Sequence, residues 1–378
     1  MSVWDDVVGQ EHAVEVLQGA VRDPAAMTHA WLFTGPPGSG RSNAARAFAA
    51  ALQCEQGGCG HCQACTTSLA GTHADVTLVT TEKVTIAIDE VRDLVGLASR
   101  SPSQGRWRVI VVEDADRMAE RTTNVLLKAI EEPPPHTVWV LCAPSPQDVM
   151  VTIRSRCRAM VLRVPPVAAV ARLLVERDGA DPALAEGAAR AAQSHIGLAR
   201  RLARDPDAWQ RRTSVLAIAR RIRGVGDAVL AAGELVEVAQ SEAKAATAER
   251  DAAEKAELLR SLGAEPGETL PPRLRSQVTE LEKDQKRRAT RHQRDVLDRA
   301  MVDLLSLYRD VLVVQLGAEV ELVNTELAET VRSLAEDSTP EQTVRRMDAI
   351  GVARERLDGN VAPLLALEAM AIALRPQG

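Results

Sequence analysis

Aromatic residues are scarce in this chain, and so is an excess of charge of either sign. Only 2% of the 378 residues are aromatic. Proteins that read many unstacked bases use aromatic side chains as stacking platforms, so this mode of binding is disfavoured. The 46 basic residues face 52 acidic ones, which leaves a net charge of −6. This balance excludes a wholly basic nucleic-acid coat, although not a local basic patch.

Long hydrophobic runs are also missing. The strongest apolar runs, at Val109–Val112 and Val138–Cys142, are far too short to cross a bilayer. The first residues, Met1–Asp6, contain neither a basic stretch nor an apolar one, which predicts that there is no secretory signal. We therefore expect a cytoplasmic protein without a membrane partner. Its cysteines are then expected to be thiols or metal ligands and not structural disulfides.

The length of the chain predicts two or three domains. Residues 1–165 alternate strand-like and helix-like segments. Strands are expected at His29–Thr34, Val76–Val79, Trp107–Val112, Thr137–Cys142 and Ala159–Val164, and helices at Ser42–Gln53, Ile88–Ser99 and Thr122–Glu132. Apolar strands separated by helices predict a parallel α/β sheet that is covered on both faces.

The strand signal disappears after Pro165 and Pro166. Residues 166–208 are expected to form short helices, and residues 209–378 an all-helical domain. Within it, two long stretches flank a loop at Gly263–Pro272, and their inner parts are polar on almost every face. A helix without an apolar stripe either bridges solvent or pairs with a neighbour, so residues 240–294 predict an antiparallel helical arm. Further helices are expected at Met301–Leu316, Leu322–Ala335, Pro340–Leu357 and Val361–Leu374.

A basic run lies on the second helix of this arm. It consists of Lys283, Lys286, Arg287, Arg288, Arg291 and Arg294. These side chains are candidates for contact with DNA phosphates. The alternative is a solvated helix, since acidic residues are interspersed among the basic ones.

A glycine-rich loop follows the first expected strand. Gly35-Pro36-Pro37-Gly38-Ser39-Gly40-Arg41-Ser42 matches the phosphate-loop pattern G-x-x-x-x-G-K-[ST] everywhere except at the lysine. Backbone N–H groups and the start of the next helix would cradle a phosphate chain, and Ser42 has the hydroxyl that would hold Mg²⁺. Arg41 keeps the positive charge but is a planar fork, not a compact ammonium. ATP or ADP with Mg is therefore the candidate ligand, and an ordinary glycine-rich turn is the alternative.

An apolar strand that ends in acids would complete a nucleotide site. Val109-Ile110-Val111-Val112-Glu113-Asp114 has this form. The usual order is Asp-Glu, in which Asp organises Mg²⁺ and Glu polarises water. Here the order is reversed, and a misplacement of about 1 Å can cost on the order of 10²-fold in rate. The alternative is a pair of solvated acids at the end of a strand.

A cluster of cysteines lies between these two motifs. The spacing C-x4-C-x2-C-x2-C is formed by Cys54, Cys59, Cys62 and Cys65. Four thiolates in this spacing predict a closed, tetrahedral, structural zinc site, because no position remains for water. An iron–sulfur cluster or a redox pair is the alternative.

Three further segments complete the pattern of a known family. They are Val7-Val8-Gly9-Gln10, Asn124–Pro134 and Ser155-Arg156-Cys157. With the motifs above, residues 1–205 resemble the bacterial clamp-loader subunits of the AAA+ class. The resemblance implies an AAA+ module at 1–165 with a zinc knuckle inserted at 54–65, a small helical lid at 166–208, and an all-α collar domain at 209–378 that carries the arm as a helical-hairpin insertion. It also implies a hetero-pentamer with gamma/tau motor subunits and delta, a sliding clamp and primer-template DNA.

Departures from the family pattern favour a non-motor subunit. Arg41 replaces the lysine, Glu113-Asp114 reverses the acidic pair, and Cys142-Ala143-Pro144 has no hydroxyl where motor subunits carry Thr-Thr. An active ATPase motor of the gamma/tau type is one alternative. A zinc-dependent interaction or redox module is another.

The resemblance also assigns roles to single residues. Arg156 matches the arginine finger, which stabilises the transferring phosphoryl group in the site of a neighbouring subunit. Arg200, in Gly197-Leu-Ala-Arg200, matches the second sensor, which contacts bound nucleotide from the lid. Val7 and Val8 would lie near the adenine, and packing in the core is their alternative role.

Overall fold

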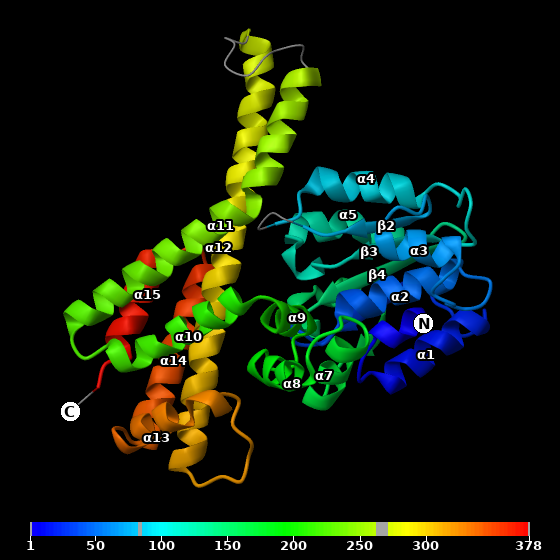
Figure 1. Cartoon of the computed structure of the whole chain (residues 1–378). Helices are drawn as coiled ribbons and strands as arrows, with labels where there is room; N and C mark the ends of the chain where they lie inside the picture. Colours follow the sequence, from blue (N-terminus) through cyan, green and yellow to red (C-terminus); the bar gives the residue numbers. More distant parts are fainter. Residues whose placement is uncertain (1, 82–84, 262–270, 377–378) are drawn as a thin grey trace. The chain divides into compact units, whose positions relative to one another are not determined.

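The computed structural model of the chain describes residues 2–81, 85–261 and 271–376 (Figure 1). They belong to two compact units, Met1–Arg204 and Asp205–Gly378. The first unit contains the sheet, and the second contains only helices and their connections among the described residues.

A five-stranded parallel sheet is the centre of the first unit. Its strands are β1 (Ala30–Thr34), β2 (Val76–Val79), β3 (Arg108–Val112), β4 (Thr137–Ala143) and β5 (Arg158–Val161), in the order β2-β3-β4-β1-β5. Every adjacent pair is parallel. This confirms the α/β class, with one change. The last strand ends at Val161 and not at Val164, because the backbone of Arg163 bonds to the side chain of Gln10.

Helices cover both faces of this sheet (Figure 1). Along β1, Trp31 and Phe33 belong to one buried cluster, and Leu32 belongs to the other. The first cluster packs under α1 (Glu11–Arg22) and α2 (Arg41–Gln53), and the second under α4 (Ile88–Ala98) and α5 (Glu120–Glu131). Side chains of a strand alternate between faces, so a central strand that is apolar throughout must be covered on both sides.

Five shorter or later elements complete the first unit. They are α3 (Gln63–Ala70), α6 (Val151–Arg154), α7 (Val167–Glu176), α8 (Pro182–Ala191) and α9 (Ile196–Arg204). Helix α8 packs against both α7 and α9. These last three helices occupy most of the range 166–208, and their assignment as a separate lid stays a prediction.

The second unit is built from six helices in its described residues. They are α10 (Pro206–Arg221), α11 (Val225–Ser261), α12 (Pro272–Gln315), α13 (Ala328–Glu336), α14 (Pro340–Asp358) and α15 (Pro363–Ala373). Their common core includes Leu235, Leu304, Tyr308, Ile350 and Leu367. The mostly helical C-terminal region therefore agrees with the sequence.

The helix expected at Leu322–Ala335 begins later in the structure than the sequence predicts. A 3-10 turn begins only at Thr325, and α13 begins at Ala328. The carboxylate of Asp310 accepts the backbone N–H groups of Val323 and Asn324, at 3.0 and 2.7 Å, together with the side-chain amide of Asn324. These bonds hold the segment in a non-helical conformation, and the hydrophobic pattern does not reveal them.

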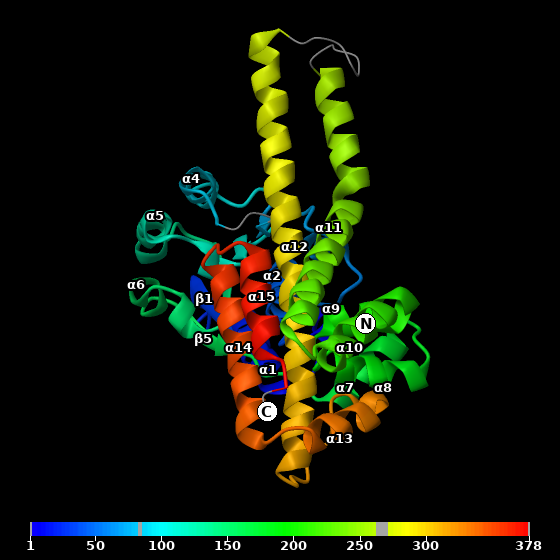
Figure 2. The same cartoon turned by 90° about the vertical axis from the view of Figure 1, so that its left-hand side faces the viewer.

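The outer parts of α11 and α12 lie side by side in both views (Figures 1 and 2). Small residues of α11, Ala239, Ala243 and Thr247, are buried along this stretch. Farther out, the guanidinium of Arg288 lies 2.7 Å from Asp251 and 2.5 Å from Glu254. The connecting residues Leu262–Leu270 lie outside the described residues, so most of the expected loop at 263–272 does too.

Candidate functional site

The glycine-rich loop connects β1 to α2 at the carboxyl end of the sheet. Gly38 and Gly40 have φ values of 88° and 85°, a region that favours glycine. A Cβ atom at Gly38 would lie 2.7 Å from the Cα of His195, so no larger residue fits without movement. Ser39 is 1% exposed, and its hydroxyl has no hydrogen-bond partner among the described residues. The loop thus has the backbone shape of a phosphate cradle.

Arg41, the departure from the phosphate-loop pattern, folds back onto its own loop. Its guanidinium donates to the carbonyl of Gly35. Burial lowers the pKa of Arg41, and the nearby Cys142, Asp116 and Asp114 oppose this effect. The positive charge of Arg41 therefore lies near acidic side chains of the same chain.

The two acids after β3 also have partners within the chain. The carboxylate of Glu113 lies 2.8 Å from the guanidinium of Arg46 on α2. Asp114 accepts the backbone N–H of Thr81 at 3.2 Å and lies 3.6 Å from Arg117. The structure therefore brings both acids and the loop to the same edge of the sheet, but it gives each carboxylate a basic neighbour.

Cys142 lies in β4 at this edge. It is fully buried, and burial raises the pKa of its thiol well above the usual range, with a smaller contribution from Glu113. Asp116 is the other perturbed group here, since burial and the charge of Asp114 raise its pKa. A protonated thiol cannot replace a hydroxyl as a strong hydrogen-bond donor to phosphate.

Arg156 lies on the surface just after α6. Its guanidinium donates to the carbonyl of Thr152 at 2.8 Å and lies 2.5 Å from the carboxylate of Glu131. The side chains of Arg156 and Glu131 are 40% and 43% exposed. Arg156 thus remains accessible, and an exposed pair of this kind holds it by at most about 1 kcal/mol.

The remaining residues expected to contact nucleotide have other contacts. Arg200 on α9 lies 2.8 Å from Asp178, whose carboxylate also lies 3.1 Å from Arg177. Val7 belongs to the buried core below the sheet, whereas Val8 is half-buried. The side chain of Gln10, which follows this segment, donates to the carbonyl of Ser39 in the glycine-rich loop at 3.1 Å. Contact of Val7, Val8 and Arg200 with nucleotide stays a prediction.

Sequence reasoning missed several partners of these residues. They are Arg46, Glu131 and Asp178. Only Glu131 lies in a segment that the family pattern includes, the stretch Asn124–Pro134. The other two are ordinary helix or loop residues in the sequence, and only the fold brings them to their partners.

Most of the basic run on the arm is paired within the chain. Lys283, Arg287 and Arg291 face Glu280, Asp284 and Asp295 at 3.4, 3.0 and 3.7 Å. Arg288 points into the seam between the helices, and Arg294 donates to Asn360 at 2.7 Å. This arrangement favours the solvated helix over a surface for DNA phosphates.

The four clustered cysteines meet at the junction of α2 and α3. The sulfur atoms of Cys54, Cys59, Cys62 and Cys65 all lie within 4.8 Å of one another. Cys54 caps the end of α2, and Cys62 caps the start of α3. Positive φ angles at Gly57, Gly58 and Gly60 allow the sharp turns between them.

The donors of this cluster suit a soft metal ion. The sulfur atoms of Cys54 and Cys62 are 3.7 Å apart, close to the roughly 3.8 Å between two thiolates on a tetrahedral zinc. The sulfur of Cys54 accepts the backbone N–H of Cys59. Burial opposes the ionisation of Cys54, but N–H groups of Cys59, Gly58 and Gln56 outweigh it and lower its pKa to about 6. The four residues could therefore hold one metal ion with no open position.

Comparisons with known proteins find similarity in part of the first unit. Residues 9–166 match the family model described as DNA polymerase III, delta subunit. The chain is 35% identical to the DNA polymerase III subunit tau of Bacillus subtilis over 159 residues. It is 38% identical to the subunit delta' of Pseudomonas aeruginosa over 151 residues. Residues 9–166 are homologous to DNA polymerase III subunits.

This DNA polymerase III homology covers only part of each protein. The tau alignment spans 41% of this chain and 28% of the relative, and the delta' alignment spans 38% and 46%. The range matched by the family model, residues 9–166, includes the glycine-rich loop, the cysteine cluster, both acids and Arg156, and it ends before Arg200. Because tau and delta' both match, the homology does not distinguish between the two types.

A solved structure resembles the whole chain loosely. A gamma subunit-related protein of Thermotoga maritima covers 96% of this chain and 98% of its own length, at 17% identity and a TM-score of 0.45.

In the described part of the chain, every helix is either too short or too polar to cross a bilayer.

Proposed function

We propose that this chain is the delta-prime, non-motor subunit of a replicative sliding-clamp loader. In this role it joins gamma/tau motor subunits and delta in a hetero-pentamer that loads a sliding clamp on primer-template DNA. The observation that carries the proposal is the contrast between two arginines. Arg41 is bound to its own loop among acids, whereas Arg156 lies half-exposed at the surface.

Arg156 would act in trans on the ATP of a neighbouring subunit. A guanidinium is permanently charged and planar, which suits it to the oxygens of a transferring phosphoryl group. Such a finger contributes on the order of 10³–10⁵-fold in rate in nucleotide hydrolases. Supporting this role, Arg156 forms an ion pair with one carboxylate in the described part of the chain, and that carboxylate is itself exposed.

The glycine-rich loop of this chain would bind a nucleotide without hydrolysing it. Gly35, Ser39 and Ser42 would hold the phosphates and Mg²⁺ of ATP or ADP, since the loop has the required shape and a free buried hydroxyl. Glu113 is held by Arg46, which opposes its use in polarising water. Val7 and Val8 would lie near the adenine, and Arg200 would contact the nucleotide after leaving its ion pair with Asp178.

Two structural assignments accompany this function. The four cysteines would hold a structural zinc ion that ties α2 to α3. Residues 166–208 would serve as the lid and residues 209–378 as the collar, with the arm between about 240 and 294 inserted in it.

A reconstituted clamp loader tests the finger role. Changing Arg156→Ala should lower ATP turnover at the adjacent site by about 10³-fold or more, because the transition state loses its neutralising charge. The measurement is steady-state ATP turnover of the assembled complex, together with the melting temperature of the variant. Arg154→Ala is the matched control, since Arg154 lies on the same segment but donates to the carbonyl of Pro146. Unchanged turnover in the Arg156 variant would refute the role.

An active motor of the gamma/tau type is the second candidate, because the chain is similar to tau as well as to delta'. The isolated chain distinguishes the two. We expect negligible ATP hydrolysis, with no further loss in Ser42→Ala and none in the control Ser99→Ala, whose hydroxyl bonds within α4. Robust hydrolysis that Ser42→Ala abolishes would instead identify a motor subunit.

A further inference from the structure

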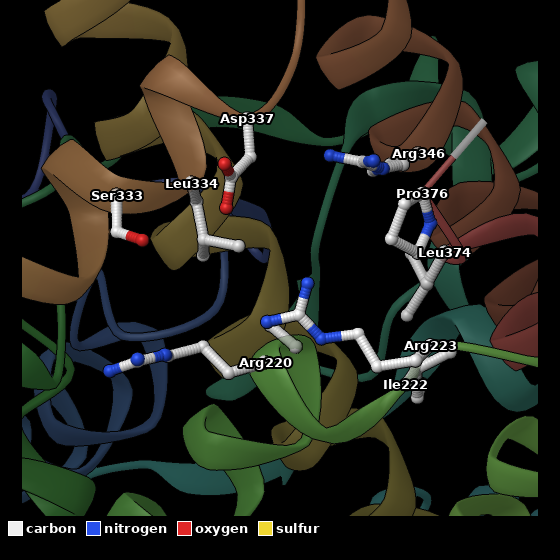
Figure 3. A pocket seen from close by; sticks show the side chains of 10 residues that line it. Arg220, Ile222, Arg223, Ser333, Leu334, Asp337, Arg346, Leu374 and Pro376 are labelled. Atoms are coloured by element: carbon white, nitrogen blue, oxygen red, sulfur yellow. The ribbon is translucent and has the colours of Figure 1, made fainter. Parts of the chain in front are cut away.

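A small pocket of the second unit is lined mainly by arginines and apolar side chains (Figure 3). It forms where the end of α10, the end of α13, α14 and the residues after α15 meet. Arg220 and Arg223 come from the first segment, Asp337 from the second and Arg346 from the third. These segments are far apart in the sequence, so no local motif predicts the pocket.

Arg346 is the unusual member of this group. The residue is only 5% exposed. Its one side-chain hydrogen bond among the described residues is a 3.5 Å contact with the carbonyl of Arg375, and its guanidinium lies 5.8 Å from the ring centre of Tyr308. Burial of a charge is costly unless an opposite charge compensates it. The buried charge of Arg346 therefore has no anionic partner among the described residues.

Arg220 and Arg223 have no acidic partner either. No described carboxylate lies within 4.0 Å of either guanidinium, and Asp337 forms no ion pair at that distance. Arg221, between them, is different, since both its Nη atoms lie 2.8 Å from Glu234. Figure 3 shows Arg223 and Arg346 pointing toward the same space. Three cations thus line a pocket that contains one carboxylate.

We propose that this pocket binds a carboxylate side chain from an acidic peptide segment of a partner protein. Guanidinium groups form short, paired hydrogen bonds with carboxylates. The cavity volume is about 20 Å³, enough for the tip of one side chain and far too little for a nucleotide. A single carboxylate would compensate Arg346 and Arg223 together.

The walls of the pocket favour a peptide over nucleic acid. Ile222, Leu334 and Leu374 line the pocket beside the arginines and are themselves buried, so the carboxylate would lie against a rigid apolar floor. The small volume admits the tip of one side chain but not the continuous row of phosphates of a nucleic-acid strand. This inference does not depend on the clamp-loader role, because it concerns a different unit of the chain.

A peptide selection on the full-length chain tests the proposal. A displayed library of random peptides is selected on the immobilised protein, and enriched sequences are synthesised with a fluorescent label. We expect enriched peptides to carry Asp or Glu. Fluorescence anisotropy should show that Arg223→Gln weakens the binding of these peptides about tenfold or more. Replacing the acidic residue of the peptide by its amide should weaken binding by a similar factor.

Two further variants make the result decisive. Arg221→Gln is the matched control and should bind as the parent does, because its side chain pairs outside the pocket. Arg346→Gln should weaken binding at least as much as Arg223→Gln, and its melting temperature is measured because Arg346 is buried. If the Arg346 variant unfolds, the binding measured for the Arg223→Gln variant decides the question, because Arg223 is exposed. The proposal would be overturned if the enriched peptides lacked acidic residues, or if Arg223→Gln left their binding unchanged. It would also be overturned if a short DNA duplex bound through Arg223 and acidic peptides did not.

Discussion

Asp75 shows how much structure one buried carboxylate can hold. It is fully buried and accepts the backbone N–H groups of Ser103, Gln104 and Gly105 at 2.7–2.8 Å. Arg108 lies 3.0 Å away. Burial alone would raise the pKa of Asp75, but the N–H groups and the Ser103 hydroxyl lower it to about 2. The loop that precedes β3 therefore depends on an ionised Asp75.

The pKa of Asp75 predicts a pH dependence of stability. A carboxyl group in the unfolded chain has a pKa of about 3.9, so ionised Asp75 contributes about 2–3 kcal/mol to the free energy of unfolding. Because the folded pKa is depressed, this contribution is complete above about pH 5 and is lost as the pH falls toward 2. Urea unfolding followed by circular dichroism should show Asp75→Asn less stable than the parent at pH 7, with a difference that shrinks below pH 4.

Asp89→Asn provides the control for this prediction. Asp89 is exposed and pairs with Arg92 within one turn of α4. Its substitution should change the free energy of unfolding by less than about 0.5 kcal/mol. A difference between Asp75→Asn and the parent that stays constant from pH 7 to acid would contradict the ionisation argument.

At the scale of the elements, the cysteine-bearing turn between α2 and α3 connects the N-terminal segment to these two helices. The carbonyl of Gly58 accepts the backbone N–H of Val3 at 3.1 Å, and that of Gly57 accepts the indole N–H of Trp4 at 3.1 Å. The turn therefore anchors the first residues of the chain as well as two helices. A metal ion held by the four cysteines would add four bonds to these contacts.

Removal of the metal should therefore loosen the N-terminal segment. We expect purified protein to contain one equivalent of zinc, and chelation to lower the melting temperature by about 5 °C or more. Hydrogen exchange should accelerate at Val3 and along α3. Metal analysis and exchange mass spectrometry make these measurements. Cys157→Ser, a thiol outside the cluster, should retain the metal, and protein that lacks zinc or contains iron would exclude the assignment.

For the whole molecule, the sequence predicts the strands better than the contacts between segments. The strands β1, β3 and β4 are buried on both faces, so each appears as a continuous apolar run with clear ends. The cysteine spacing and the glycine-rich loop are also local, and the structure places each of them at a junction of elements. These features depend on neighbours in sequence, which is why reading along the chain finds them.

Contacts across long separations could not be predicted in this way. The pair of Arg46 and Glu113 joins residues 67 positions apart, and the pocket around Arg346 needs four segments. The helix expected from Leu322 fails for the same reason, because the carboxylate of Asp310 binds that backbone from another element. Periodicity measures the burial of one element and carries no information about which polar group lies opposite it.

One continuous helix, α12, spans 44 residues and serves both the core of its unit and the arm. At 1.5 Å per residue its axis is about 66 Å long. Its inner half contains the buried Leu304 and Tyr308, while its outer half is held against α11 by Arg288. No proline or glycine interrupts it after Pro272 to act as a hinge. A force applied near the outer end would therefore act as on a stiff lever, and its torque would reach the core at Tyr308 instead of being absorbed along the way.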